Sequence, residues 1–234
     1  MRDVKTETVT AVARPEAVGF VLAGGQSSRM GQDKALLPFA GRPLVTHALA
    51  ILRQAGLSVS IAGARPSARA SLEAFAPVIE DPEPGLGPLA GICAALASTS
   101  ARLAVFLPVD APLIPPQLIG FLVQSACVTG RSVTVASAGG FGQTFPAVLD
   151  RAVLATLEAT LKASGGGKSS SCFSAFKAAG ERLGRPIHNI AVELLAQSGQ
   201  VKHPRGLAPD RWFFNLNTPA DVEQAEALIG AKLE

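Results

Sequence analysis

The chain has 234 residues, of which 48% are hydrophobic and 17% are charged, so it can bury a sizeable core and cannot be disordered throughout. Its formal net charge of +3 comes from Lys and Arg residues scattered along the sequence, and it holds one Trp and no Tyr. A nucleic-acid-binding protein usually shows a basic stripe with interleaved aromatic residues, so this composition argues against a nucleic-acid partner.

The first half of the chain alternates short apolar runs with segments of helical spacing. The run at 18–22 ends in glycines, as a buried strand at the start of an α/β unit does. Further strands are predicted at 57–62, 77–81 and 103–107, and helices at 44–56, 67–75 and 89–98. This alternation predicts an α/β fold of three layers, in which a mostly parallel, twisted sheet carries helices on both faces.

The second half has a less regular pattern. A helix is predicted at 116–127, because Pro116 suits a first turn, and the strand predicted at 145–149 is partly antiparallel because its partner is close in sequence. The stretch 162–171 is rich in Gly and Ser and predicts a flexible loop. The other expected elements are a strand at 132–136, helices at 173–180 and 190–196, a strand at 212–215, and a last helix capped by Thr218 and opened by Pro219.

The cysteines and the first residues favour a cytoplasmic protein. Cys93, Cys127 and Cys172 are far apart and follow no metal or redox spacing, which predicts three reduced, mostly buried thiols. No apolar stretch reaches the roughly 20 residues that a membrane span needs. Residues 1–17 lack the apolar segment of a signal peptide, so we expect a loose N-terminal extension before a single domain at 18–234.

The segment from Leu22 to Lys34, LAGGQSSRMGQDK, follows the first predicted strand directly. Gly24 and Gly25 let the backbone turn tightly and bring N–H groups close to a ligand. Two serines add hydroxyl groups, and Arg29 and Lys34 add positive charges. Amides, hydroxyls and cations that converge after a strand form a phosphate cradle. The alternative is an ordinary strand-to-helix turn, which would suit a lone glycine pair better than this dense set.

Two better-known phosphate loops do not fit the sequence. A Walker A loop requires a Gly five residues before Gly-Lys-Ser, but Lys162 stands at that distance before Gly167-Lys168-Ser169. The dinucleotide fingerprint GxGxxG is not met by Gly85, Gly87 and Gly91, whose spacing is wrong. We expect all of these to be loop residues.

Three further segments extend the pattern that begins at 22–34. Residues 79–81 read IED and precede GPLAG at 87–91, residues 107–115 read LPVDAPLIP, and residues 215–219 read NLNTP. In order and spacing, the four segments resemble the molybdenum cofactor guanylyltransferases, which are members of the MobA-like nucleotidyltransferase superfamily. The resemblance extends over nearly the whole chain.

The resemblance implies a Rossmann-like nucleotidyltransferase fold and a defined reaction. Enzymes of this family transfer GMP from Mg-GTP to the terminal phosphate of molybdopterin cofactor and release pyrophosphate. The implied cofactor is Mg²⁺, and the implied partners are GTP and molybdopterin cofactor. Molybdoenzyme maturation proteins are further candidate partners, and no membrane partner is expected. The Ala-Gly-Gly of residues 23–25 is typical of guanylyl enzymes, whereas sugar-phosphate and cytidylyl enzymes usually carry Ala-Ala-Gly.

The roles of single residues follow from the motifs and from the chemistry. The nucleophile is already a phosphate, so the reaction needs positioning and charge neutralisation more than a base. We expect Arg29, Lys34 and Asp110 to be catalytic, with Asp110 as the Mg²⁺ ligand at the end of a strand. The expected nucleotide-binding residues are Leu22, Ala23, Gly24, Gly25, Lys34, Asp81 and Asp110, and the expected acceptor-binding residues are Asn215 and Asn217.

Alternatives remain open at three of these positions. Asp110 is also suited to cap the turn or helix that follows it, and Asp81 to stabilise a turn. Asn217 is also suited to the entry of the last helix, beside Thr218.

One departure from the family concerns the base. Where the family often has an Asn after the second strand, this chain has AGAR at 62–65. We therefore expect backbone groups of 22–24 to recognise the purine, with GTP preferred and ATP detectably accepted. The departure leaves open a related enzyme with another base or acceptor, such as a molybdopterin cytidylyltransferase. A non-catalytic nucleotide-binding protein of the same fold is a third hypothesis, against which the joint presence of Arg29, Lys34 and Asp110 speaks.

Overall fold

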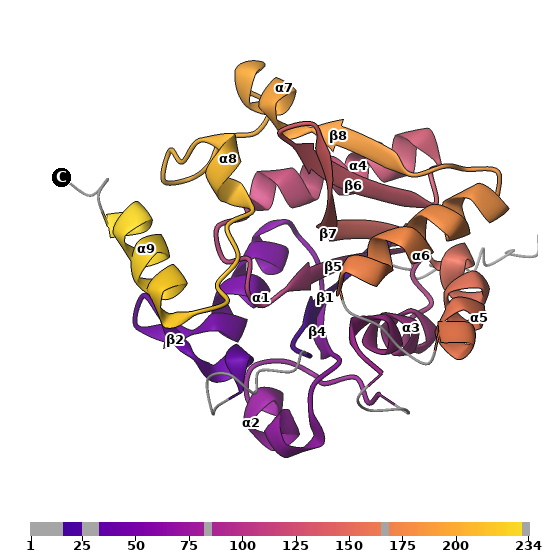
Figure 1. Ribbon diagram of the computed structural model, residues 1–234, viewed down its shortest axis with the longest axis horizontal. Helices are drawn as coiled ribbons and strands as arrows, with labels where there is room; N and C mark the ends of the chain where they lie inside the picture. The colour runs from indigo at the N-terminus through magenta and orange to yellow at the C-terminus, as the bar shows by residue number, and fades with distance from the viewer. Residues whose placement is uncertain (1–15, 25–32, 82–85, 165–168, 231–234) are drawn as a thin grey trace, which may run out of the picture.

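The computed structural model describes residues 16–24, 33–81, 86–164 and 169–230 (Figure 1). A six-stranded sheet in the order β4-β1-β5-β7-β6-β8 forms its centre. The strands are β1 (Ala17–Leu22), β4 (Val59–Ala62), β5 (Leu103–Pro108), β6 (Val133–Ala138), β7 (Phe141–Asp150) and β8 (His188–Ala191). Strand β7 is antiparallel to both β5 and β6, and the other neighbouring pairs are parallel. The carboxyl ends of β1, β4, β5, β6 and β8 therefore meet at one edge.

Helices cover both faces of this sheet, which confirms the predicted three-layer α/β architecture. One face packs against α1 (Leu44–Gln54) and α4 (Pro116–Thr129), with α9 (Pro219–Gly230) at its margin. The other face packs against α3 (Pro88–Ser98), α5 (Leu154–Ser164) and α6 (Ser169–Arg182). Shorter elements are α2 (Arg69–Glu73), α7 (Val192–Gln197), α8 (Pro209–Trp212), a two-stranded ribbon of β2 (Pro38–Phe39) and β3 (Arg42–Pro43), and the 3₁₀ turns η1 (Lys34–Leu36), η2 (Pro66–Ala68) and η3 (Arg151–Val153).

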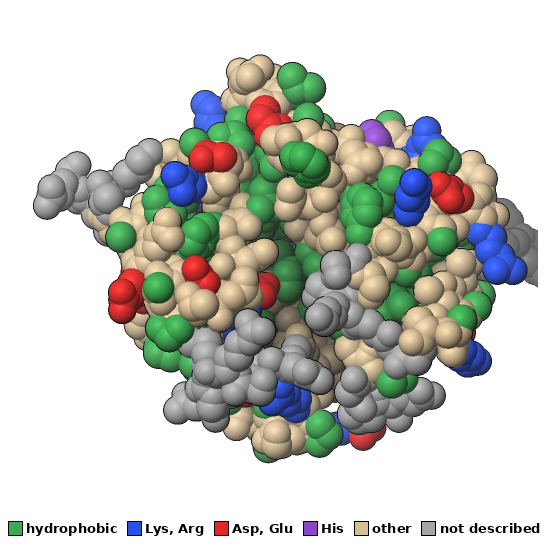
Figure 2. Space-filling view, viewed as in Figure 1, with side chains coloured by type: hydrophobic (Ala, Val, Ile, Leu, Met, Phe, Trp, Pro, Cys, Tyr) green, Lys and Arg blue, Asp and Glu red, His purple; other side chains and the backbone are tan. Residues whose placement is uncertain are grey.

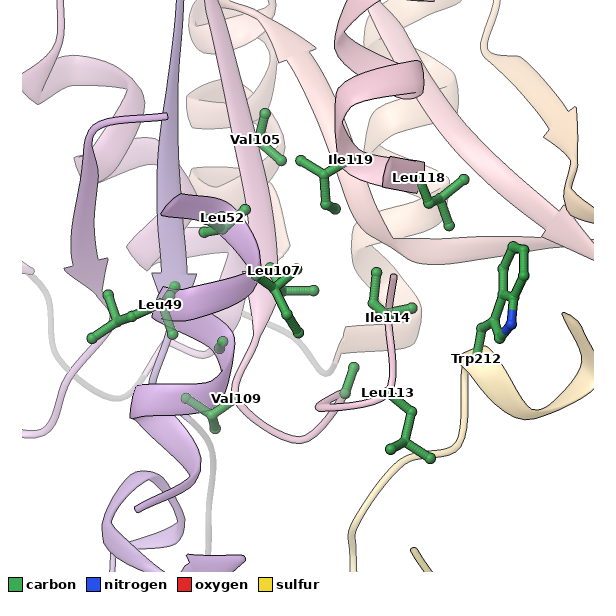
Figure 3. Packing of buried hydrophobic residues seen from close by; sticks show 14 of the residues in the cluster. Leu49, Leu52, Val105, Leu107, Val109, Leu113, Ile114, Leu118, Ile119 and Trp212 are labelled. Atoms are coloured by element: carbon green, nitrogen blue, oxygen red, sulfur yellow. The ribbon is translucent and has the colours of Figure 1, made fainter. Parts of the chain in front are cut away.

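Strand β5 shows why the central strands read as continuous apolar runs. Val105 and Leu107 point into the cluster beneath α1 and α4, whereas Phe106 points into the cluster beneath α3 and α6. Because successive side chains of a strand alternate between faces, a strand buried on both sides needs apolar residues throughout. Figure 3 shows Val105 and Leu107 beside Leu49 and Leu52 of α1 and Ile119 of α4.

Four expected elements differ from the structure. The predicted strand at 77–81 is reduced to a single parallel bridge between Val78 and Ile61. The loop predicted at 162–171 is wrong where the structure describes it, because α5 continues to Ser164 and α6 begins at Ser169. Small polar residues are poor helix formers, but here the two helices pack on each other and on α3, and tertiary packing overrides propensity.

The other two differences lie near the C-terminus. The helix predicted at 190–196 begins only at Val192, because the preceding residues pair with β6 as strand β8. The strand predicted at 212–215 is absent from the described structure. Trp212 instead ends α8, fully buried, and its Nε1–H donates to the Leu207 carbonyl oxygen at 2.9 Å. An aromatic run resembles a strand, but a buried Trp also needs a hydrogen-bond acceptor, which this turn provides.

Two predictions on domain organisation are not decided by the structure. Most of the expected extension at 1–17 lies outside the described residues, although Ala17 already belongs to β1. The single domain at 18–234 remains a prediction. Within the described part of the chain, no helix is both long and apolar enough to span a membrane.

Candidate active site

The sheet brings two distant segments of the sequence together. Strands β1 and β5 are parallel neighbours, with Leu22 opposite Pro108, and the N–H of Val109 donates to the Leu22 carbonyl oxygen at 3.2 Å. The segment after β1 and the turn after β5 therefore start side by side at the carboxyl edge. This is the edge at which open α/β sheets bind ligands.

Lys34, Asp110 and Asn217 meet at this edge. Lys34 Nζ donates to Asp110 Oδ2 at 2.8 Å and to Asn217 Oδ1 at 3.0 Å. The side chains of Lys34 and Asp110 are 18% and 25% exposed, so the pair is largely shielded from solvent but still accessible to a ligand. The structure thus joins two residues predicted to be catalytic with one predicted to bind the acceptor.

Local capping explains how Lys34 is held. Lys34 is the first residue of η1, and Asp33 Oδ1 accepts a hydrogen bond from the Ala35 N–H at 2.9 Å. An Asp at this position satisfies an otherwise unpaired N–H group and fixes the start of the turn. Asp33 therefore acts as a cap, a role that the sequence analysis did not identify.

Asn217 is held by the start of the last helix and by the turn after β5. The Leu216 N–H donates to the Asp110 carbonyl oxygen at 2.9 Å, which ties the two segments together. Thr218 caps α9 as predicted, because its Oγ1 accepts from the Asp221 N–H at 3.2 Å. In return, Asp221 Oδ2 accepts from the N–H groups of Asn217 and Thr218 at 2.8 and 2.7 Å. The two side chains form a reciprocal capping box.

The hydrogen bonds of the capping box also set the charge of Asp221. The backbone N–H of Asn217 and the Thr218 hydroxyl lower the pKa of the Asp221 carboxyl below its usual value, and the charge of Lys34 acts in the same direction. The carboxylate form is therefore the one that the folded chain favours.

Three glycines make the packing behind the site possible. A Cβ atom at Gly24 would overlap the carbonyl oxygen of Gly63, and one at Gly91 would lie 2.9 Å from the Gly63 Cα. Gly63 itself has a φ of +69°, which favours glycine. The start of the glycine loop, the end of β4 and the first turns of α3 thus touch backbone to backbone. Gly91, the last residue of the predicted motif at 87–91, therefore has a role in packing.

Some predicted site residues lie outside the described part of the chain, and others are not hydrogen-bonded to Lys34 within it. Gly25 and Arg29 lie outside the described residues, so their roles stay predictions. Asp81 is half-buried, lies near enough to Cys93 for its charge to act on that thiol, and is not among the partners of Lys34. Asn215 is exposed, and its side chain makes no hydrogen bond with the residues described. The roles predicted for Asp81 and Asn215 also remain untested.

The structure narrows the possible modes of base recognition. Ala62 is fully buried, and its side chain lies in the apolar cluster with Leu22, Leu89 and Ile92. Its carbonyl oxygen accepts from the Ala23 N–H at 3.0 Å. The Ala23 N–H and the Leu22 C=O are thus already engaged within the sheet. Recognition by backbone groups of 22–24 stays a prediction, restricted to the groups that remain.

Asp110 is the residue best suited to hold a metal ion. Among the residues described, no three His, Cys, Asp or Glu side chains gather around a common point. A preformed cage is not required for Mg²⁺, which often binds one or two carboxylates together with substrate phosphates and water. The Asp110 carboxylate and the nearby Asn217 amide oxygen are hard oxygen donors of the kind that this ion prefers.

The cysteines are free and do not take part in this site. Cys93 and Cys172 are buried, and burial raises the pKa of each thiol to about 12. Cys127 is partly buried. Thiols with raised pKa values are poor nucleophiles at neutral pH, so the predicted structural role of these residues fits their environment.

One face of the molecule is hollowed. Figure 2 shows a hollow near the middle of this face, between the side that carries α9 and the side that carries α6. An acidic side chain lies at its α9 side, and hydrophobic side chains are visible in its depth.

Two comparisons of sequence place the chain among known proteins. The sequence model of a family described as MobA-like NTP transferase domain matches residues 19–176. A Xanthomonas euvesicatoria protein named molybdenum cofactor guanylyltransferase is 47% identical over 115 residues, which make up 47% of this chain and 57% of that relative. A protein of the same name from Vibrio cholerae is 31% identical over 227 residues, which make up 96% of this chain and 98% of the relative.

A solved structure shows the same fold. Molybdopterin-guanine dinucleotide biosynthesis protein A from Archaeoglobus fulgidus superposes with a TM-score of 0.70 at 21% sequence identity. The superposition covers 91% of this chain and 98% of that protein. The likeness supports the Rossmann-like nucleotidyltransferase fold expected from the motifs.

Proposed function

The chain belongs to the family of MobA-like NTP transferases, and on this basis we propose that it transfers GMP from Mg-GTP to the terminal phosphate of molybdopterin cofactor. Pyrophosphate is the second product. The motif-based assignment to this family is thus confirmed. The observation that carries the proposal is the contact of Lys34 Nζ with both Asp110 and Asn217 at the carboxyl edge of the sheet.

The reaction requires charge neutralisation more than proton transfer. A terminal phosphate oxygen of the acceptor attacks the α-phosphorus in line, a new P–O bond forms, and the bond to pyrophosphate breaks. In this proposal Lys34 binds phosphate oxygens at the centre of the displacement, which is supported by its partly exposed ammonium and its two hydrogen bonds. Such a fixed positive charge stabilises the developing negative charge more than a mobile one does.

Asp110 and Asn217 have complementary roles in this proposal. Asp110 would hold Mg²⁺, which when bound neutralises phosphate charge and orients the triphosphate. Asn217 keeps its amide group beside Lys34 and supports the acceptor phosphate. Arg29 and Gly25 as further phosphate contacts, Asp81 as a nucleotide contact and Asn215 as an acceptor contact belong to the same proposal. So do a cytoplasmic location and molybdoenzyme maturation proteins as partners.

The test measures pyrophosphate release by the purified full chain with molybdopterin cofactor and GTP, ATP or CTP in turn. We expect release with GTP that stops when Mg²⁺ is chelated and resumes when it is restored. Reactions without acceptor control for simple hydrolysis. Preference for CTP would instead identify a cytidylyltransferase. Tight GTP binding without pyrophosphate release would indicate a nucleotide-binding protein without this activity.

A further inference from the structure

The last helix, α9, contacts both sides of the candidate active site. At its first turn, Asp221 Oδ2 binds the backbone N–H groups of Asn217 and Thr218. One and a half turns later, Glu226 Oε1 accepts from the Ala40 N–H at 2.7 Å. Ala40 lies in the turn between β2 and β3, a few residues after η1, which carries Lys34. In Figure 1, α9 accordingly lies beside β2.

The contact at Asp221 acts directly on Asn217. Asn217 is exposed, and the two residues that follow it open a helix whose first N–H groups have no partner within the helix. The Asp221 carboxylate takes up the N–H of Asn217 itself, 2.8 Å away. The side chain of Asn217 then reaches Lys34 Nζ at 3.0 Å, across 183 positions of the sequence. Asp221 is therefore hydrogen-bonded to Asn217 directly and is connected to Lys34 through Asn217.

The contact at Glu226 fixes the opposite side. Ala40 has a φ of +46°, an uncommon value for a residue with a side chain. Its N–H is held by the Glu226 carboxylate, and the Leu44 N–H closes the ribbon by donating to the Leu37 carbonyl oxygen at 2.9 Å. The ribbon that follows Lys34 is thus tied to the same helix as Asn217.

We infer that α9 is a brace that holds Asn217 against Lys34, and that Asp221 is a positioning residue for nucleotidyl transfer. The inference deepens the proposed function and rests on it. Without the Asp221 carboxylate, two N–H groups lose their acceptor, and the backbone that carries the Asn217 amide is free to shift. Catalysis is sensitive to such shifts, because a displacement of about 1 Å can lower the rate on the order of 100-fold.

An ordinary helix cap is the competing explanation. A cap stabilises the folded chain without any specific relation to Lys34 or Asn217. Its removal would lower the melting temperature and change activity equally whether or not the Asn217 amide is present. A brace instead predicts that the effect of losing Asp221 disappears once the Asn217 side chain is gone. The double-mutant cycle between the two residues separates these explanations.

The experiment compares Asp221→Ala, Asp221→Asn, Asn217→Ala and the Asp221→Ala/Asn217→Ala double variant. We expect Asp221→Ala to lower kcat/KM about tenfold or more. Asp221→Asn keeps an acceptor oxygen in place and should retain most of the activity. In the Asn217→Ala background, Asp221→Ala should add less than about a twofold change. Glu226→Gln, which keeps an amide oxygen for Ala40, should have a smaller effect than Asp221→Ala.

Glu223→Ala is the matched control, because Glu223 is exposed on the same turn of α9 and does not contact Asn217. Melting temperatures of all variants report on the fold. Asp221→Ser, which keeps one oxygen near the backbone, replaces Asp221→Ala if that variant does not fold. A full, undiminished effect of Asp221→Ala in the Asn217→Ala background would overturn the brace, as would loss of activity in Glu223→Ala of the same size.

A second measurement does not depend on turnover. Labelling of lysine amines by acetic anhydride, followed by mass spectrometry, reports how tightly the Lys34 amine is held. Its labelling rate should rise to a similar extent in Asp221→Ala and Asn217→Ala and stay unchanged in Glu223→Ala. If the variants show this pattern but the wild type transfers no GMP, the proposed function fails and the brace stands. If GMP is transferred and the pattern is absent, the brace fails alone.

Discussion

The two halves of the central sheet belong to one framework but differ in the residues that follow the carboxyl ends of their strands. In the parallel half, β4-β1-β5, the connections that leave the carboxyl edge carry Gly24 and Lys34 after β1, Gly63 after β4 and Asp110 after β5. In the half made of β7-β6-β8, strand β6 turns straight back into β7 through Gly139 and Gly140.

The difference reflects how the strands are joined. Parallel strands need long crossover connections, and each of these leaves the sheet at the same edge, so polar residues from distant segments collect there. A two-residue hairpin has room only for residues that make the turn, here two glycines with positive φ. The exposed side chain next to this turn is the apolar Phe141. The parallel half therefore holds the polar centre, and the mixed half completes the core.

The largest expected effect contrasts two aspartates, each near the end of a strand. Asp110→Asn keeps the size of the side chain but loses the charge that would hold Mg²⁺, so we expect activity to fall on the order of 1000-fold. Asp150 is the last residue of β7 in the mixed half and caps η3 by accepting from the Ala152 N–H at 2.9 Å. Asp150→Ala should cost about 1 kcal/mol of folding free energy and leave kcat/KM unchanged.

Pyrophosphate release at several Mg²⁺ concentrations and thermal unfolding measure the two outcomes. Recovery of pyrophosphate release by Asp110→Asn at high Mg²⁺ would mean that Asp110 affects only the affinity for the metal. Full activity of this variant at low Mg²⁺ would exclude Asp110 as the principal ligand.

The next effect concerns the ammonium that links the catalytic segments. Lys34→Ala should raise the transition-state free energy by about 3 kcal/mol, because one fixed charge on the phosphates is lost. The fold should survive, since Lys34 is not part of the apolar core. Lys177 of α6, whose side chain is exposed near Glu181, is the matched lysine of the mixed half. Steady-state kinetics of Lys34→Ala and Lys177→Ala would refute the proposed role of Lys34 if the two variants had similar kcat/KM values.

A smaller effect is expected at a position of the parallel half that faces the core. Ala62→Asn would bury an amide in an apolar cluster, so the folded state should lose about 1–3 kcal/mol. The ratio of GTP to ATP turnover should stay the same, because the side chain lies beneath α3. Ala64→Asn, at a partly exposed position two residues on, is the control for stability. Competition between GTP and ATP in both variants tests this prediction, and a changed ratio in Ala62→Asn would show that position 62 faces the nucleoside.

The smallest effect compares one histidine from each half. Desolvation lowers the pKa of His47 in α1 and of His188 in β8 below the usual 6.5. For His47, the Phe39 carbonyl oxygen lies 2.8 Å from Nε2, and this hydrogen bond partly offsets the effect of desolvation on the pKa.

The sign of the pH effect follows from these shifts. The unfolded chain binds protons at a higher pH than the folded chain does, so the contribution of both residues to stability is present above pH 6.5 and falls as the pH drops through the folded pKa values. His47→Gln and His188→Gln should each reduce the slope of the unfolding free energy against pH. The reduction should be larger for His47→Gln, because this ring is more deeply buried. Denaturant unfolding between pH 5 and 8 measures the slopes, and identical slopes in the wild type and both variants would contradict the prediction.

The contrast between the halves also explains what could be predicted from the sequence. Val105, Phe106 and their neighbours form a run that is apolar on both faces. Such a run predicts a buried parallel strand from the local sequence alone. Because parallel strands end at one edge, Lys34 and Asp110 could both be expected near the active site, and the structure brings their side chains into contact. Strand β8 has four residues and one neighbour, so its sequence carries no comparable signal.

Contacts that depend on tertiary structure escaped prediction. The capping roles of Asp33 and Asp221 rest on one and two hydrogen bonds to backbone groups, for which the sequence shows only an acidic residue at a suitable spacing. The burial of Ala62 depends on the approach of α3, and the burial of Trp212 on the turn that precedes α8. Each of these features depends on a contact partner that lies far away in the sequence or follows no helical or strand periodicity.

The meeting of Gly24, Gly63 and Gly91 limits how this protein can be diversified in the laboratory. A library that randomises codon 24 alone should return glycine among the functional clones, because every other residue would place a carbon atom on the Gly63 carbonyl. Randomising codons 63 and 91 as well offers no easy escape, since each of the three positions touches the backbone of another. Sequence diversity near this site is therefore best sought at the neighbouring Ala64, which is partly exposed.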